Sequence, residues 1–184
     1  MFIKIGQRPD HGFDQPLGLL SDCHRRIEYF LDVLIRIAER SGSALTASER
    51  TDLQGALDYF ATAAPRHTAD EEQSLFPRLR RSADPAAQAA LATLARLESD
   101  HTEADTHHRA VDALVRGWLA GGTLDSAAAA ELRGRLQALR AIYTAHIATE
   151  DRELFPAAAR ILSAGDQQAI GQEMASRRAV NTAS

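Results

Sequence analysis

The chain is short of cysteine, of aromatic residues and of long apolar runs, and each shortage excludes a class of protein. A single cysteine among 184 residues cannot form a disulfide within the chain. Aromatic residues make up only 5% of the sequence while alanine is abundant, which favours closely packed helices over a β-sandwich. No apolar run approaches the roughly 20 residues that cross a bilayer, so we expect no membrane partner.

The charge balance and the first residues indicate which partners and which location to expect. The formal net charge is −4, and no cluster of basic residues has interleaved aromatic residues, so we expect no nucleic-acid partner. The segment Met1–Asp10 lacks a sustained apolar stretch and predicts no signal peptide. We therefore expect a cytoplasmic protein. One bundle domain should span residues 1–162, followed by a C-terminal helix and tail at residues 163–184.

Apolar residues recur at helical spacing in four long segments, and no segment alternates over several residues as a strand would. The four segments cover residues 16–40, 46–80, 84–118 and 125–154, and a short fifth helix is expected over residues 163–178. Short loops join the segments, so neighbouring helices should run antiparallel. The predicted fold is all-α, an up-down-up-down four-helix bundle with a short additional C-terminal helix.

Local signals place the helix ends. Thr46 and Glu49 have the spacing of a capping box, and Asp84 precedes a proline at the first helical position. Pro65 lies inside the second segment and should bend it one turn before His67. Pro77 near the end of that segment predicts that its last turn is a separate piece.

One phrase occurs twice in the chain. Residues His67–Pro77 and His146–Pro156 both read H-x3-E-x3-L-F-P. A histidine and a glutamate four positions apart project from the same side of a helix. Two such helices facing each other would direct two imidazoles and two carboxylates to one point, which is the donor set of a metal site.

Two further histidines extend this set. His24 and His101 lie on the apolar stripes of the first and third segments, with nearly the same offset as the repeated phrase. A single histidine on an apolar face is more often a core residue, but four of them with two inward carboxylates are costly to bury without a cation. Imidazole and carboxylate are ligands for iron, manganese or zinc. The predicted metal ligands are His24, His67, Glu71, His101, His146 and Glu150.

Six side chains exceed what one tetrahedral zinc requires. Two carboxylates that can bridge, with two histidines at each end, suit a dinuclear site. Ferritin-like di-iron bundles use Glu-x-x-His with further glutamates, whereas this chain has His-x3-Glu and more histidine.

With these motifs, residues 17–160 resemble the hemerythrin-like, or HHE cation-binding, family. The resemblance implies a four-helix bundle around two iron ions joined by an oxo or hydroxo bridge and two carboxylates. Carried over to this chain, Glu71 and Glu150 would be the bridging carboxylates. His24 and His67 would then serve one iron, and His101 with His146 the other; the remaining position would accept O2, NO or peroxide.

The chain departs from the oxygen-carrying members at one position. Those proteins have a second histidine one turn after the third-helix histidine, where this chain has Asp105. Asp105 is a candidate further ligand or an acceptor for a ligand imidazole. His108, two turns along the same face, is either a ligand or a core or channel residue.

Three other kinds of residue stand beside the predicted ligands. Cys23 lies about 100° around the helix from His24. It is either a small packed residue or a thiolate ligand or redox sensor. Tyr143 is either a core tyrosine or a hydrogen-bond donor to a bound ligand. One or two of the neighbouring acidic residues should orient a ligand imidazole, with these candidates: Asp70, Glu72, Asp151 and Glu153.

The same six residues fit several functions. The first is a di-iron protein that binds or senses O2, NO or peroxide. The alternatives are a di-iron enzyme that reduces peroxide or NO with an external reductant, and iron sensing or donation for the repair of iron centres. A plain helical scaffold is the remaining reading. Ile170, Met174 and Val180 of the fifth helix could cover a bundle end or a second subunit, which leaves a homodimer possible.

Overall fold

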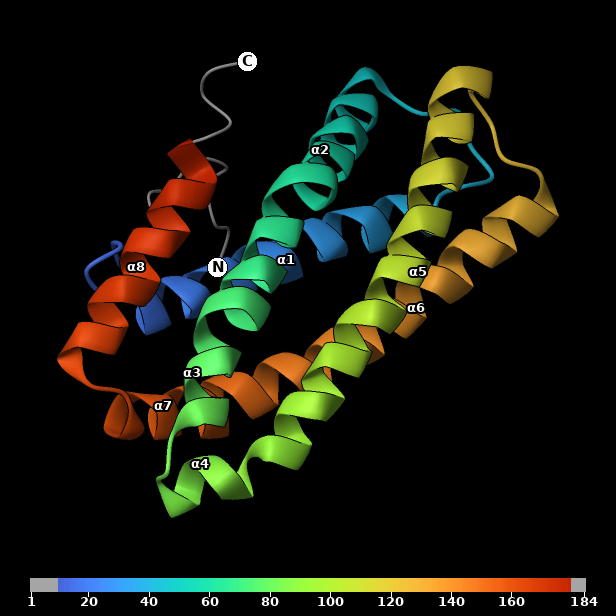
Figure 1. The fold of residues 1–184 in the computed structure, drawn as a ribbon. Helices are drawn as coiled ribbons and strands as arrows, with labels where there is room; N and C mark the ends of the chain where they lie inside the picture. Colours follow the sequence, from blue (N-terminus) through green and yellow to red (C-terminus); the bar gives the residue numbers. More distant parts are fainter. Residues whose placement is uncertain (1–9, 180–184) are drawn as a thin grey trace.

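The computed structural model describes residues 10–179, which form a helical bundle without strands (Figure 1). Its four long helices are α1 (Pro16–Ala38), α2 (Ala47–Asp70), α5 (Leu91–Gly121) and α6 (Ser126–Thr149). The helices α1 and α5 each contact both α2 and α6, so the four enclose a common interior. The all-helical class predicted from the sequence is confirmed. Within residues 10–179, no helix combines the length and the apolar character needed to cross a membrane.

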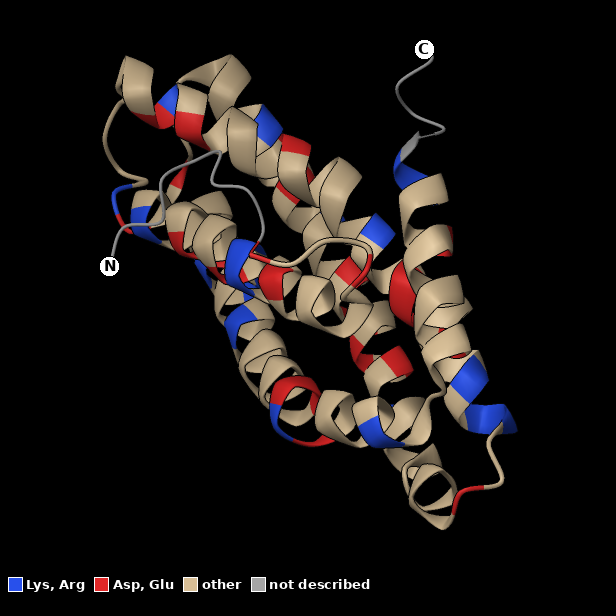
Figure 2. Ribbon diagram, turned by 90° about the vertical axis from the view of Figure 1, so that its left-hand side faces the viewer, with Lys and Arg blue, Asp and Glu red and all other residues tan. Residues whose placement is uncertain are grey.

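Six shorter elements complete the described chain. The π-helical segment η1 (Glu71–Leu75) and α3 (Phe76–Arg81) continue α2, and η2 (Glu150–Leu154) and α7 (Phe155–Ile161) continue α6. The helix α4 (Pro85–Ala89) precedes α5, and α8 (Ala164–Ala179) follows α7. Figure 2 shows charged residues of both signs on the same helices.

The predicted caps are present. The hydroxyl of Thr46 accepts a hydrogen bond from the backbone N–H of Glu49 at 3.2 Å, and the Glu49 carboxylate accepts one from the backbone N–H of Thr46 at 2.8 Å. The helix α5 ends at Gly122, whose φ of 81° is in the left-handed region that glycine adopts without strain. Pro65 lies inside α2, and the bend expected at this proline stays a prediction.

The segment expected as one helix over residues 84–118 is two helices, which corrects the sequence prediction. The break falls at Ala90, where the sequence has no glycine or proline. The short helix α4 contacts α3 and α7 and buries Ala87 completely, and Gln88 donates a hydrogen bond to the carbonyl of Ser82 at 2.7 Å. Tertiary packing therefore sets this break, and local sequence does not announce it.

The two π-helical segments begin at the two glutamates of the repeated phrase. The backbone N–H of Phe76 donates to the carbonyl of Glu71, five residues earlier, and Phe155 does the same with Glu150. A proline follows each phenylalanine; it lacks an N–H and crowds the carbonyl four residues before it. A wider turn relieves that crowding, and such turns are frequent at functional sites.

The buried apolar residues form two clusters, one toward each end of the bundle. One cluster includes Leu34, Trp118 and Leu136, and the other includes Phe76 and Leu97. Along each long helix, together with the short segments that continue α2 and α6, the predicted ligands lie between the residues of the first cluster and those of the second. A polar layer thus separates two apolar layers.

The helix α8 packs against α1, α2 and η1 (Figure 1). Ile170 and Met174 are fully buried in the second apolar cluster, so they cover the end of the bundle. Val180, the third residue considered for this role, lies outside the described residues. The separation of residues 163–184 as a unit of their own stays a prediction.

Candidate metal centre

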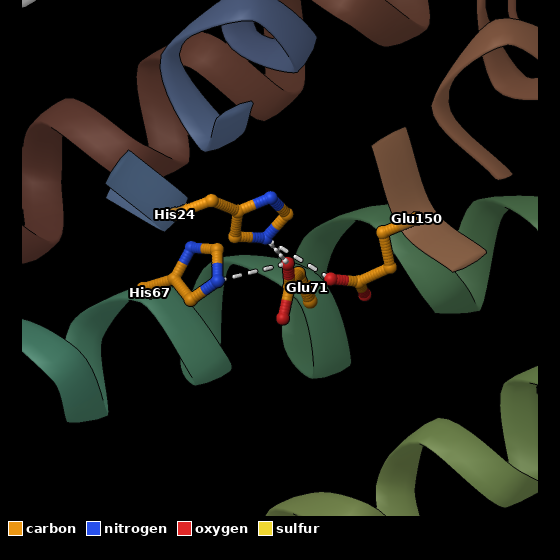
Figure 3. A group of neighbouring side chains, drawn as sticks. All are labelled: His24, His67, Glu71 and Glu150. Atoms are coloured by element: carbon orange, nitrogen blue, oxygen red, sulfur yellow. Dashed lines mark ion pairs between the residues drawn. The ribbon is translucent and has the colours of Figure 1, made fainter. Parts of the chain in front are cut away.

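The six predicted ligands meet in the middle of the bundle. Each long helix supplies one histidine, and each π-helical segment supplies its first residue, a glutamate. The six residues form two overlapping groups, and within each group one nitrogen or oxygen atom per residue lies within 4.8 Å of those of the others. The first group is His24, His67, Glu71 and Glu150, whose side chains point toward a common centre in Figure 3, and the second is Glu71, His101 and His146.

Every imidazole presents its Nε2 atom to a carboxylate. Nε2 of His24 and Nε2 of His146 both lie 3.1 Å from Oε2 of Glu150. On Glu71, Oε1 lies 3.2 Å from Nε2 of His67 and Oε2 lies 3.3 Å from Nε2 of His101. Glu71 therefore faces both groups, one with each oxygen.

Burial makes this arrangement expensive unless a cation is present. Glu71 and Glu150 are both 0% exposed, and none of their four carboxylate oxygens has a hydrogen-bond partner. A buried ionised carboxylate without compensation costs several kcal/mol, and two of them also repel each other. The donor set, four imidazoles and two carboxylates, therefore fits transition-metal ions.

Three of the four imidazoles are oriented by an outer carboxylate. Nδ1 of His24 lies 3.0 Å from Asp151, Nδ1 of His101 lies 2.8 Å from Glu72, and Nδ1 of His146 lies 3.3 Å from Asp100. A carboxylate only accepts, so each Nδ1 carries the proton that it donates. Each Nε2 is then the atom left to bind a metal ion, as in metal sites with carboxylate–histidine pairs.

His67 is the exception among the four. Its side chain is buried, and its Nδ1 atom has no hydrogen-bond partner. Of the acidic neighbours named from the sequence, Glu72 and Asp151 orient ligand imidazoles, whereas Asp70 pairs with Arg177 and Arg178.

The pKa values of the metal-free site show the same need for a cation. Burial and the charge of Glu150 raise the pKa of Glu71 to about 7. Burial alone would lower the pKa of His24, but the nearby carboxylates of Asp151 and Glu150 outweigh it and raise that pKa to about 10. Protons therefore occupy the centre in the absence of a metal, and a metal ion must displace them to bind.

A small cavity of about 20 Å³ lies among the four histidines and is also lined by Tyr143. A cavity of about 210 Å³ adjoins it between α2 and α5, and Ala64, Thr68, His101 and Tyr143 line both. The second cavity gives small molecules a path toward the ligand atoms, beside the proline inside α2.

The two further candidate ligands lie along this second cavity. Asp105 is exposed and pairs with Arg109 at 3.1 Å, outside both ligand groups. His108 also lies outside them; its ring packs on Phe60, and its Nε2 lies 2.8 Å from the hydroxyl of Tyr143. Burial lowers the pKa of His108 to about 4, so this imidazole is neutral at pH 7.

Sequence reasoning missed two features of the surroundings. One is Asp100, which orients His146. Its place directly before the predicted ligand His101 was the only sign in the sequence that it lies near the site. The pairing of Asp70 with α8 could not be read from spacing. Cys23 is mostly buried and lies outside both ligand groups, and burial raises the pKa of its thiol to about 11.

Comparison with known proteins identifies the family of this chain. The family model of the hemerythrin HHE cation-binding domain matches residues 15–158, which include all six residues. The chain is also similar to an uncharacterised protein of Haemophilus influenzae, with 28% identity over 171 residues that span 91% of this chain and 92% of that protein. The family match covers most of the chain and contains both copies of the repeated phrase. The chain therefore belongs to the hemerythrin HHE cation-binding domain family.

Proposed function

We propose that this chain is a cytoplasmic non-haem di-iron protein that binds or senses O2, NO or peroxide at a carboxylate-bridged iron pair. The observation that carries the proposal is the convergence of four imidazole Nε2 atoms on two fully buried carboxylates whose oxygens lack hydrogen-bond partners. The proposal takes the four long helices as an up-down-up-down bundle, which their mutual contacts support.

The residues divide naturally between two ions. His24 and His67 would hold one ion and His101 with His146 the other, while Glu71 has an oxygen toward each pair. When bound, an iron pair supplies electrons to a diatomic ligand or peroxide. The outer carboxylates keep each Nε2 available by holding the proton on Nδ1.

The bundle also controls what reaches the centre. The two apolar clusters exclude bulk water from both ends, and the 210 Å³ cavity has room for a small molecule. Tyr143 lines both cavities, and its hydroxyl can donate a hydrogen bond to a small ligand.

One observation favours an enzyme as the second candidate. The hydroxyl of Tyr143 and Nε2 of His108 lie 2.8 Å apart and connect the inner cavity to the outer one. Such a pair can pass a proton to peroxide or NO as it is reduced. Turnover would require an external reductant.

The test is reversible ligand binding. The protein is reconstituted with ferrous iron without oxygen, exposed to O2 or NO, and its visible spectrum is recorded. The proposal expects a ligand-dependent charge-transfer band that is lost when the gas is removed under argon. Continuous consumption of peroxide with an added reductant would support the enzyme instead. No spectral response to O2, NO or peroxide would contradict both.

A further inference from the structure

The first half of the chain carries His24, His67 and Glu71, and the second half carries His101, His146 and Glu150. In both halves the carboxylates that hold the imidazoles occupy matching sequence positions, with one exception. Glu72 follows the inner Glu71 and orients His101 of the other half, and Asp151 follows the inner Glu150 and orients His24. These two contacts cross between the halves and match each other. The repeat in the sequence is thus also a repeat in how the ligands are held.

The exception concerns His67. In the second half, Asp100 directly precedes His101 and lies 3.3 Å from Nδ1 of His146. The matching position in the first half, directly before His24, is Cys23. The residue that matches His146 is His67, which is 3% exposed and whose Nδ1 has no hydrogen-bond partner. A thiol is a weak donor and a weak acceptor, so it does not replace the carboxylate.

The nearby charges are also unequal. Asp70, which directly precedes Glu71, is 0% exposed and pairs with the guanidinium groups of Arg177 at 2.8 Å and Arg178 at 2.7 Å. Asp151 beside His24 adds a second carboxylate, so the two carboxylates and the two guanidinium groups around His24 and His67 cancel in charge.

Around His101 and His146 the charges do not cancel, because two carboxylates lie near one arginine. Asp100 pairs with a single arginine, Arg96, at 3.2 Å, while Glu72 adds a second negative charge. A divalent cation is favoured where negative charge prevails. Both the missing carboxylate and the arginine pair thus weaken the position at His24 and His67.

We propose that the two metal positions are unequal: the position at His101 and His146 fills first, and the position at His24 and His67 binds more weakly because Cys23 stands where the other half has Asp100. This inference rests on the proposed pair of metal ions. Loss of an outer-shell partner weakens metal binding by roughly 10- to 100-fold, which is the expected ratio of the two affinities.

The test is a titration of the metal-free protein with ferrous iron under argon, against a competing chelator. The wild type should bind in two steps separated by roughly 10- to 100-fold. The variant Cys23→Asp should tighten the weaker step by about 10-fold, and Asp100→Asn should weaken the stronger step by a similar factor. Cys23→Ala, which adds no carboxylate, is the matched control and should keep the wild-type steps.

Two further variants assign the steps to positions. His67→Ala should keep the tight step and lose the weak one, while His146→Ala should do the reverse. Far-UV circular dichroism checks that each variant is folded. If Cys23→Asp is unfolded, Asp100→Asn still tests the claim.

The outcomes separate this inference from the proposed function. Two ions bound with equal affinity would overturn the inequality and leave the iron pair standing. Two unequal steps that neither Cys23→Asp nor Asp100→Asn changes would overturn the role of Cys23. Saturation below two ions per chain would overturn the proposed iron pair itself.

Discussion

Asp151 lies 3.0 Å from Nδ1 of His24 through its Oδ1 atom, so a residue of η2 holds the imidazole that α1 contributes. The same oxygen accepts a hydrogen bond from the hydroxyl of Ser21 at 2.7 Å, which fixes the carboxylate in turn. Burial opposes ionisation of Asp151, but its hydrogen bond to His24 keeps its pKa below the ordinary value. The ligand geometry therefore depends on contacts between the two halves.

This contact predicts the effect of Asp151→Asn. The amide cannot accept with the strength of a carboxylate, so His24 should lose both its orientation and part of its basicity. We expect iron affinity to fall by roughly 10- to 100-fold with the fold retained, measured by chelator competition and circular dichroism. Glu153→Gln, an exposed change in the same π-helical segment, is the control and should leave affinity unchanged. Equal effects of the two variants would contradict the orienting role.

Tyr143→Phe removes the hydroxyl that lines both cavities and contacts His108. We expect unchanged iron content but faster release of O2 or NO. One lost hydrogen bond of about 1 kcal/mol corresponds to about 5-fold, measured by stopped-flow spectroscopy. Tyr29→Phe, a change at the edge of the first apolar cluster, should not alter release. Identical release rates in the wild type and Tyr143→Phe would show that the hydroxyl does not reach the ligand.

The lowered pKa of His108 predicts a pH-dependent stability. Its pKa is about 4 in the folded protein against 6.5 for the free side chain, so the unfolded chain binds the proton more tightly. Stability from this group is complete above pH 6.5 and is lost as pH falls toward 4. In His108→Gln, the melting temperature of the metal-free protein should fall less steeply between pH 6.5 and 4. A parallel pH profile in both proteins would refute a buried neutral His108.

The pairing of Asp70 with Arg177 and Arg178 predicts that α8 is fastened at its C-terminal end. Asp70→Ala leaves two partly buried guanidinium groups without their carboxylate partner, and breaking a buried pair costs about 3–5 kcal/mol. Urea unfolding should show this loss. Glu173→Gln, which breaks the more exposed pair with Arg78, should cost less than about 1 kcal/mol. A comparable cost for both variants would contradict the difference in burial.

The convergence of the six histidine and glutamate side chains could be predicted from sequence because each of them carries a local signal. Residues four apart in the repeated phrase share a helix face whatever the bundle geometry, and His24 and His101 interrupt apolar stripes where a charged layer is otherwise unfavourable. The capping box at Thr46 was predictable for the same reason, since it depends on residues within one turn.

The features that sequence did not predict depend on contacts between distant segments. The break at Ala90 follows from the packing of α4 on α3 and α7, and the pairing of Asp70 follows from where α8 returns to the bundle. The π-helical turns were only partly predictable from the sequence. Their prolines could be seen, but a proline near a helix end predicts termination as readily as a widened turn.

Iron stoichiometry after anaerobic reconstitution, combined with Mössbauer spectroscopy, tests the central claim most directly. The account predicts two iron ions per chain in the wild type, magnetically coupled when both are ferric, and fewer than two in Glu150→Ala. One iron or less per chain at saturation, or preferential retention of zinc, would contradict it.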